Sequence, residues 1–377
     1  MRVLICPDKF AGSISAVDAA AAVADGWRTV AGGDELTLRP LADGGPGFLE
    51  VLGEALGGRR VEVPTSDPLG RPADGWVLVA GEPAAPPVAY VESAQACGLH
   101  LLDDTERDPK VTTSYGLGVL LQAAVETGAR QVVVGLGGSA VNDAGAGMLA
   151  AIGAAPLDAA GYALPYGAAA LAGVAALDGV PRLRQVSLVA ATDVDNPLLG
   201  VHGASSVFGP QKGASREDVL LLDGALERFA AVLERDLPTC PPGVADVPGA
   251  GAAGGLGAAL LALGGRVESG IGLVRRLTGL DAALADAHLV ITGEGSFDHQ
   301  SLRGKVVAGV AAAALEQGVP CVVVAGQVSA GRREAAAAGV TEAYALVDEL
   351  GSVAEAMTWP AEGLRRLGTR LARRWSR

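Results

Sequence analysis

The sequence predicts a two-domain α/β protein in which the second domain is inserted into the first. Segments typical of strands and helices alternate at both ends of the 377-residue chain, and a turn-rich run with a less regular pattern separates them. This length fits two or three domains at about 100–200 residues each. Half of the residues are hydrophobic, which is enough for a sizeable core.

Strand and helix patterns alternate in both terminal segments. In the first we expect strands over 3–6, 36–41 and 60–63, a helix to about Val30 capped by Ser13 or Ser15, and a helix after Gly47. In the last we expect strands over 288–292, 320–325 and 343–347, helices over 306–317 and 332–338, and a C-terminal helix. Such alternation is typical of a parallel sheet covered by helices. Residues 1–66 and 287–377 should therefore form one open flavodoxin-like or Rossmann-like domain.

Residues 67–286 form the predicted inserted α/β domain, which opens on the turn-rich run DPLGRP. We expect strands over 76–79, 88–91, 131–135 and 186–191 and helices over 115–127 and 217–235. The uncharged run 247–265 has the length of a membrane span, but its first half is Gly and Ala, which gain little free energy in lipid. We interpret it as a glycine-rich loop and a buried helix.

Composition and charge limit the binding partners and the cellular compartment that the sequence predicts. The net charge of −13 argues against nucleic acid and anionic membrane as partners, because both bind basic surfaces. Arginines of the C-terminal helix are interpreted as complementing its own dipole. The four cysteines lie far apart without a CxxC pair, and Pro7 interrupts the N-terminal apolar run too early for a signal peptide. We expect a cytoplasmic protein without a zinc site or disulfides.

Polar residues gather where five expected segments end: PDK (7–9), ADGG (42–45), GGSAVND (137–143), TDVDNP (192–197) and GEGSFD (293–298). In an open α/β sheet, ligands bind at the carboxyl ends of the strands. The five segments together therefore predict a ligand site.

The run from Gly135 to Ser139 is predicted to bind phosphate. A strand enters glycines and then an expected helix from Asp143, and free N–H groups at a helix start favour an anion. Gly135, Gly137 and Ala140 also match a loose dinucleotide fingerprint, and a tight turn without a ligand is the alternative. The chain contains neither a Walker A sequence nor protein-kinase signatures.

Carboxylates and lysines supply the remaining candidate chemistry. Asp193 and Asp195 could bind Mg²⁺, which prefers carboxylate oxygen, or orient an attacking hydroxyl, and bracing of their loop is the alternative. Glu294, between two glycines, could serve a metal or a nucleotide. Cations that could hold a carboxylate or phosphate are Lys9, Lys212 and Lys305.

Ten segments occur in this order up to about Gly326: PDKFAGSISA, LADGG, TSDPLG, VESAQACGLHLL, RDPKVTTSYGLG, VVGLGGSAVNDAGAGML, TDVDNPLLG, FGPQKGAS, VPGAGAAGGLGAAL and VITGEGSFDHQSLRGK. They resemble the successive conserved blocks of the bacterial glycerate kinase family that is distinct from the MOFRL type. The resemblance implies ATP-dependent phosphorylation of glycerate, usually at the 2-hydroxyl, with Mg²⁺. It also implies a two-domain fold with the second domain inserted in the first.

Several positions depart from the pattern of that family. Many members read PDSFKGS or PDKFKGS where this chain has Ala11, and TGEGRxD where it has Ser296. Many read ADGGEGT where it has Pro46 and Phe48, and Ala144 replaces a common glycine. A lost lysine or arginine could have bound the carboxylate of the small acid, so these departures bear on the identity of the substrate.

Candidate roles follow from these residues and from the resemblance. Catalytic roles are assigned to Asp193, Lys9 and Asp43, and metal binding to Asp193 and Asp195. Substrate binding is assigned to Asp8, Ser13 and Asp43. Nucleotide or phosphate binding is assigned to Gly137, Gly138, Ser139, Asn142, Lys212, Gly293 and Glu294. The expected cofactors are ATP and Mg²⁺, and the expected partners are glycerate or a related hydroxy acid. The oligomeric state stays open, a homodimer included.

Three alternatives stay open at this point. The chain could be a kinase for a related hydroxy acid or polyol. It could be a nicotinamide-dependent dehydrogenase, although Asp158 is the only acid spaced to hold a ribose. It could also bind a metabolite without catalysis, which the retained Asp43, Asp193, Asp195 and Glu294 disfavour.

Overall fold

The computed structural model describes residues 1–81, 85–183, 185–299, 301–302 and 306–376, and it divides into two compact units. Unit 1 contains Met1–Asp43, Glu50–Leu56 and Ile271–Arg377, and unit 2 contains Gly44–Leu49 and Gly57–Gly270. Each unit pairs a sheet with helices, which confirms the predicted α/β class. The predicted domain boundaries after residues 66 and 286 stay a prediction.

A five-stranded parallel sheet forms the centre of unit 1, in the order β13-β12-β11-β1-β2. Its strands are β1 (Arg2–Ile5), β2 (Glu35–Leu38), β11 (Leu289–Phe297), β12 (Cys321–Val328) and β13 (Val340–Ala345). Numbered within the unit, this is the 2-1-3-4-5 order of flavodoxin-like sheets, with the strand order reversing at β1. The flavodoxin-like prediction for this sheet is confirmed.

Helix α1 (Ala16–Arg28) begins where Ser15 caps it, because the Ser15 Oγ accepts a hydrogen bond from the Asp18 backbone N–H. Helix α15 (Pro360–Trp375) confirms the expected C-terminal helix and buries an apolar face that includes Leu364, Leu367 and Leu371. The remaining helices of this part of the chain are α2 (Phe48–Leu56), α9 (Gly270–Thr278), α10 (Leu280–Asp286), α11 (Val306–Glu316), α12 (Arg332–Ala337), α13 (Leu346–Leu350) and α14 (Val353–Thr358).

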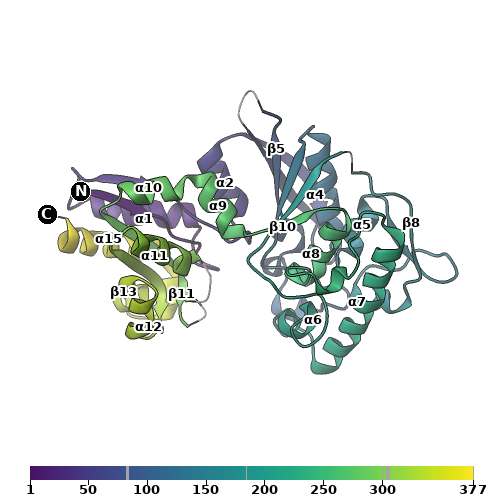
Figure 1. Cartoon of the computed structure of the whole chain (residues 1–377). Coiled ribbons are helices and arrows are strands. Elements are labelled where there is room, and N and C mark those ends of the chain that lie inside the picture. The colour runs from purple at the N-terminus through teal and green to yellow at the C-terminus, as the bar shows by residue number, and fades with distance from the viewer. Residues whose placement is uncertain (82–84, 184, 300, 303–305, 377) are drawn as a thin grey trace. The chain divides into compact units, whose positions relative to one another are not determined.

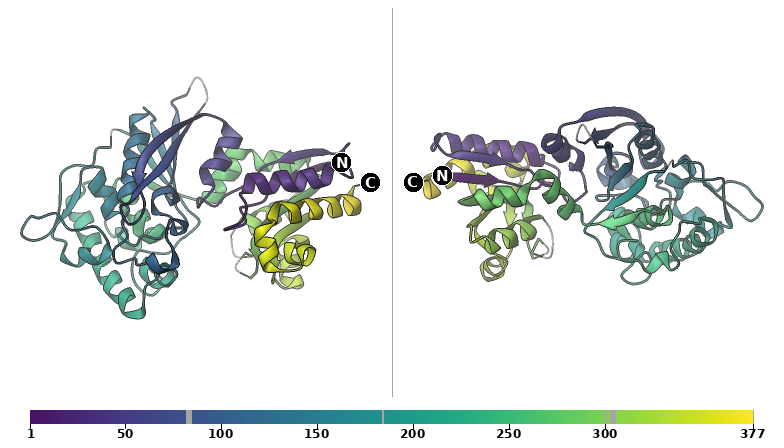
Figure 2. Two further views of the ribbon diagram at one scale, coloured as in Figure 1. Left: turned by 180° about the vertical axis from the view of Figure 1, so that it is seen from behind. Right: turned by 45° about the horizontal axis from the view of Figure 1, so that its top comes forward.

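Helices α1 and α15 lie side by side (Figures 1 and 2), and two glycines allow their backbones to meet. A Cβ on Gly26 would lie 1.9 Å from the Arg365 carbonyl oxygen, and one on Gly368 would lie 2.2 Å from the Val23 carbonyl oxygen. The Thr369 hydroxyl donates to the Gly26 carbonyl oxygen across the contact at 3.0 Å. The first and last helices of the chain are therefore held together at backbone distance.

A six-stranded mixed sheet forms the centre of unit 2, in the order β10-β9-β6-β5-β4-β3. Its strands are β3 (Arg59–Ser66), β4 (Pro72–Ala80), β5 (Val88–Glu92), β6 (Gln131–Gly135), β9 (Ser187–Ala191) and β10 (Arg266–Glu268). The last four are parallel, whereas β3 and β4 are antiparallel to their neighbours.

The sequence interpretation placed the strand over 60–63 in the first parallel sheet, and this was wrong. Strand β3 instead pairs with β4 as a hairpin. The reason lies in the turn between them, where the Asp67 Oδ1 accepts the backbone N–H groups of Leu69 (2.8 Å) and Arg71 (3.0 Å). This turn reverses the chain and directs β4 back along β3.

The other long elements of unit 2 are α4 (Tyr115–Glu126), α7 (Arg216–Asp236) and α8 (Ala252–Ala262). Shorter ones are α3 (Ala94–Cys97), α5 (Ala146–Ala151), α6 (Ala204–Phe208) and the β7–β8 pair (Ala155–Leu157, Ala176–Asp178). Helix α8 is buried almost throughout, as predicted for the uncharged run. Among the described residues, every helix is too short or too polar to cross a membrane.

The glycine contact of α1 and α15 leads to a stability prediction. We expect Gly26→Ala to lower the free energy of unfolding by about 1–3 kcal/mol, because the new methyl group overpacks the crossing. As a control, Gly53→Ala in α2 adds a methyl group where nothing lies within 4 Å. It should raise that free energy by about 0.5–1 kcal/mol, because alanine favours a helix over glycine. Urea denaturation measures both, and equal effects of the two changes would contradict the prediction.

Candidate functional site

A cavity of about 440 Å³ lies in unit 1, where segments that follow or end β1, β11 and β12 meet. Its polar lining comes from Asp8, Lys9, Ser13, Asp43, Glu294, Ser296, Asp298 and Gln327. The strand order of the sheet reverses at β1, and open α/β sheets bind ligands at such a point. The cavity is therefore the candidate active site of unit 1.

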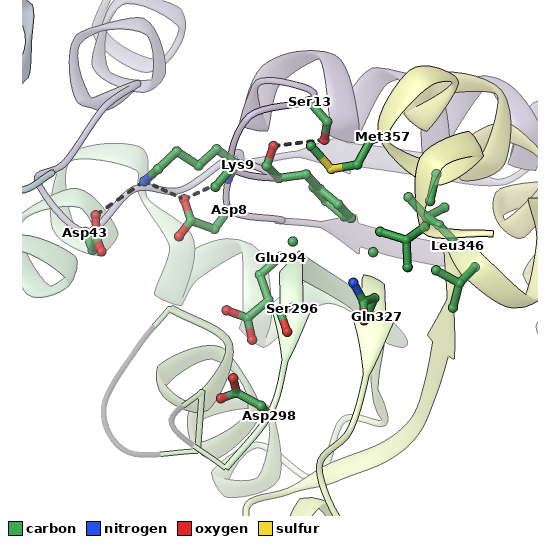
Figure 3. A pocket seen from close by; sticks show the side chains of 17 residues that line it. Asp8, Lys9, Ser13, Asp43, Glu294, Ser296, Asp298, Gln327, Leu346 and Met357 are labelled. Atoms are coloured by element: carbon green, nitrogen blue, oxygen red, sulfur yellow. Dashed lines mark hydrogen bonds and ion pairs between the residues drawn. The ribbon is translucent and has the colours of Figure 1, made fainter. Parts of the chain in front are cut away.

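Lys9 is placed between two carboxylates of this pocket (Figure 3). Its Nζ lies 3.8 Å from the Asp8 Oδ1 and 3.6 Å from the Asp43 Oδ1. The Asp8 Oδ1 also accepts the Lys9 backbone N–H at 2.7 Å. Asp8 is mostly buried, whereas the side chain of Asp43 is 41% exposed and thus reachable by a substrate hydroxyl.

Glu294 enters the pocket from within a strand, which corrects the predicted strand end at residue 292. Strand β11 continues to Phe297 because it pairs with β12 as far as Val328. Glu294 is only 8% exposed, and the preceding carbonyl oxygen of Gly293 accepts the Asp8 backbone N–H at 2.8 Å. The sheet itself thus fixes the position of Glu294 relative to the loop after β1.

Three further positions of the pocket bear on its chemistry. Ser13 lines it, and the Ser13 hydroxyl donates to the Phe10 carbonyl oxygen at 3.0 Å. Ala11 and Ser296, two of the departures from the pattern of the family that the sequence resembles, line the same pocket. Both departures therefore face one cavity.

Lys212 is the centre of a second polar cluster, in unit 2. It ends a short 3₁₀ turn, Pro210–Lys212, and is 1% exposed. The Lys212 Nζ donates to the Ser139 Oγ at 3.0 Å and to the Val141 carbonyl oxygen at 2.6 Å. Burial lowers the pKa of Lys212 to about 7, although the charge of Asp143 opposes the shift.

Asn142 is buried beside this cluster. Its Nδ2 donates to the Ser205 Oγ at 2.9 Å, while its Oδ1 is buried without a hydrogen-bond partner among the described residues. A buried acceptor of this kind costs free energy unless a donor reaches it. A bound ligand or water could supply that donor, which agrees with the predicted binding role of Asn142.

Asp143 is a residue whose importance sequence reasoning missed, since we treated it only as a helix start. Its carboxylate accepts the Ser114 backbone N–H and hydroxyl, both at 2.9 Å, and the backbone N–H groups of Gly145 and Gly147, both at 3.1 Å. Burial raises the pKa of Asp143, and these four hydrogen bonds oppose the rise. The carboxylate therefore links the segment 139–147 to the start of α4. The run of small residues after Asp143 was the sequence signal that could have indicated this role.

The predicted helix from Asp143 was wrong in its start, because α5 begins only at Ala146. Gly138 instead has φ +63° and its carbonyl oxygen accepts the Leu99 backbone N–H at 2.8 Å, which joins the segment to a neighbouring loop. A dinucleotide fingerprint needs a glycine turn that leads directly into a helix. Gly137 and Gly138 lack that context, which disfavours the dehydrogenase alternative.

Asp193 and Asp195 lie in the loop after β9, the strand next to β6. Both are exposed, and the Asp193 Oδ1 accepts the Ser269 hydroxyl at 2.6 Å. Carboxylate oxygen suits a hard cation. Across the described residues, however, no group of three or more His, Cys, Asp or Glu side chains is arranged to hold a metal.

The structure thus brings the predicted site residues together in separate sets. Asp8, Lys9, Ser13, Asp43 and Glu294 line one pocket. Ser139, Asn142 and Lys212 belong to the buried cluster of unit 2. Lys305 lies outside the described residues, and the functional roles of all these residues stay predictions.

The buried lysine leads to a pH prediction. Between pH 7 and about 10.5 the unfolded chain holds a proton on Lys212 that the folded chain has lost, so this residue makes stability rise with pH. We expect Lys212→Met to remove that rise, measured as urea unfolding free energies from pH 7 to 10. Lys110→Met is the control, because a hydrogen bond to Asp218 raises the pKa of Lys110. Parallel pH profiles of wild type and Lys212→Met would contradict the assignment.

Comparison with known proteins gives a consistent result. The sequence model described as "Glycerate kinase family" matches residues 3–376. A glycerate kinase of Halalkalibacterium halodurans is 41% identical over 94% of this chain and 93% of its own, and the glycerate 2-kinase of Escherichia coli is 38% identical over 99% and 97%. A crystal structure from Salmonella typhimurium, described as "putative glycerate kinase 2", superposes with a TM-score of 0.80 at 38% identity, covering 99% of this chain and 98% of that one. With this match over nearly its whole length, the chain belongs to the glycerate kinase family.

Proposed function

We propose that this protein is an ATP-dependent glycerate kinase that transfers the γ-phosphoryl group of Mg·ATP to the 2-hydroxyl of glycerate. The observation that carries the proposal is the pocket at the strand-order reversal, where Lys9 and several carboxylates meet in a chain of this family. The family assignment favours phosphoryl transfer, and the name of the Escherichia coli relative favours the 2-hydroxyl.

Phosphoryl transfer depends mainly on positioning and on charge stabilisation. In the proposed mechanism Asp8, Ser13 and Asp43 bind the acceptor, and a carboxylate accepts the proton of its hydroxyl as the new O–P bond forms. At the same time the bond between the γ-phosphorus and the β–γ bridging oxygen breaks, and ADP leaves with that oxygen. The ammonium group of Lys9, between Asp8 and Asp43, stabilises negative charge on the phosphoryl oxygens. Within unit 2, Ser139, Asn142 and Lys212 are the residues proposed to bind phosphate.

The carboxylates of Asp193 and Asp195 have the donor chemistry that Mg²⁺ prefers, so they would hold the ion. When bound, Mg²⁺ offsets the negative charge of the ATP phosphates. Asp193 is the more constrained of the two, because the Ser269 hydroxyl donates to it. We further propose a cytoplasmic location and glycerate and ATP as the small-molecule partners, without nucleic acid or membrane.

The activity is tested by an ATP-consumption screen of the purified chain over glycerate, related hydroxy acids and small polyols, with the product identified by NMR. We expect glycerate to be turned over and phosphorus to appear at the 2-position. Turnover of another hydroxy acid alone would replace the substrate assignment, and NAD binding without ATP turnover would reject the kinase.

The role of Asp193 is tested by Asp193→Asn, which keeps the shape of the side chain and removes its charge. If Asp193 accepts the proton, kcat should fall by about 10²–10⁴-fold with ATP binding nearly intact. If it holds the metal, Mg·ATP binding should also weaken, and excess Mg²⁺ should partly restore it. Asp178→Asn, at an exposed position of β8, controls for loss of charge alone. A folded Asp193→Asn variant with wild-type kcat would rule out both roles.

The pocket positions Ala11 and Ser296 are tested by restoring the family residues as Ala11→Lys with Ser296→Arg. A charge-assisted hydrogen bond contributes roughly 1.5–3 kcal/mol, so the preference among hydroxy acids should change by about tenfold or more. Ratios of kcat/KM for glycerate and its analogues measure the change, with each single variant made alongside. An unchanged ratio in the double variant would mean that neither position contacts the acid.

A further inference from the structure

One end of the unit 1 pocket is apolar, and this surface does not complement a small hydroxy acid. The apolar side chains of the lining include Phe10, Leu346, Val353, Ala356 and Met357, and Leu346 and Met357 mark this end in Figure 3. Phe10, Leu346 and Ala356 are at most 6% exposed, while Val353 and Met357 are about half exposed. Glycerate carries only polar groups on three carbons, so burying it against such a wall would leave those groups without hydrogen bonds. The apolar end therefore suits a different part of the reaction complex.

The two ends of the pocket lie on opposite sides of it (Figure 3). Leu346 and Met357 lie on the side away from Asp43 and the Lys9 ammonium group, with Glu294 and Ser296 of β11 between the two ends, and Gln327 of β12 lies on the same side as Leu346. A ligand that reaches both ends must be elongated, with a flat or apolar group at one end and a charged group at the other. A nucleotide has this arrangement.

Charge gives a second constraint. The described lining includes four carboxylates, those of Asp8, Asp43, Glu294 and Asp298, together with the cation Lys9. Carboxylates repel an anion but accept hydrogen bonds from hydroxyl groups. The middle of the pocket, at Glu294, therefore suits a ribose, whereas an anionic group is stabilised best near Lys9.

We propose that the apolar end binds the purine base of ATP, so that the nucleotide lies across the pocket with its phosphates toward Lys9. This inference rests on the proposed ATP-dependent function and adds to it the site of the base. The volume of about 440 Å³ lies within the range of about 300–1,000 Å³ for small-molecule sites, and the pocket occupies the sheet position where such folds bind nucleotides.

Three groups recognise the base and sugar in this arrangement. The Met357 thioether packs against the ring, a favourable contact for sulfur and an aromatic group. The exposed amide of Gln327 can both donate to and accept from ring nitrogens. Glu294 accepts hydrogen bonds from the ribose hydroxyls.

The test places a charge in the apolar end with Met357→Asp. We expect the Kd for Mg·ADP, measured by calorimetry, and the KM for ATP to rise at least about tenfold, because the base would bury a carboxylate. The KM for glycerate should stay near its wild-type value. Met357→Leu should bind Mg·ADP nearly as the wild type does. Leu221→Asp in α7 is the matched control, since its exposure of 47% is close to the 48% of Met357. Val353→Asp is the second variant if Met357→Asp does not fold.

The outcomes separate this inference from the proposed function. A rise in the KM for glycerate with an unchanged Kd for Mg·ADP would assign the apolar end to the acceptor and overturn the inference while the kinase stands. No change in either constant would also overturn it. The wild-type chain could also fail to phosphorylate glycerate while Met357→Asp still loses Mg·ADP binding. That result would support the base site and reject the proposed substrate.

Discussion

The reversal of strand order at β1 is the constraint on which the candidate site of unit 1 depends. The chain leaves β1 toward β2 on one side, while β11 lies on the other side. Connections that leave in opposite directions leave the carboxyl ends of β1 and β11 uncovered. The loop after β1 supplies Asp8 and Lys9 to this opening, and the long strand β11 supplies Glu294. Backbone pairing therefore places groups that are almost 290 residues apart in one cavity.

In unit 2 the predicted binding residues depend on a different interaction, in which hydrogen bonds stabilise the buried side chains of Asp143 and Lys212. Burying Asp143 and Lys212 costs free energy, as the raised pKa of the acid and the lowered pKa of the base indicate. Four hydrogen bonds to Asp143 and two from Lys212 offset part of this cost. Because Ser114 and Lys212 come from other parts of the chain and both bind to the segment 139–147, the cluster stabilises one arrangement of the loop that carries Ser139 and Asn142. A preorganised loop of this kind suits a binding site.

Two of the departures from the family pattern change the charge of the pocket. Ala11 and Ser296 come from segments far apart in the sequence, yet both line the cavity around Lys9. Their neutrality leaves the described lining rich in carboxylates. This charge balance bears on which acid the protein accepts, whereas the family assignment rests on the whole chain.

The sequence by itself determined the elements whose patterns are local. Helix α1 and its Ser15 cap, the strand at 131–135 and the buried helix within 247–265 follow from periodicity, capping and glycine content, and the ordered blocks identified the family. Only the tertiary structure decided which sheet β3 joins, how far β11 extends and that Lys212 is buried. The last two depend on partners distant in the chain, because β11 is extended by its pairing with β12 and Lys212 is enclosed by its contacts with Ser139 and Val141. Strand β3 instead depends on its hairpin partner β4 and the turn at Asp67. The local sequence does not indicate such distant partners, because the contacts between them contribute free energy only when the segments meet in the folded chain.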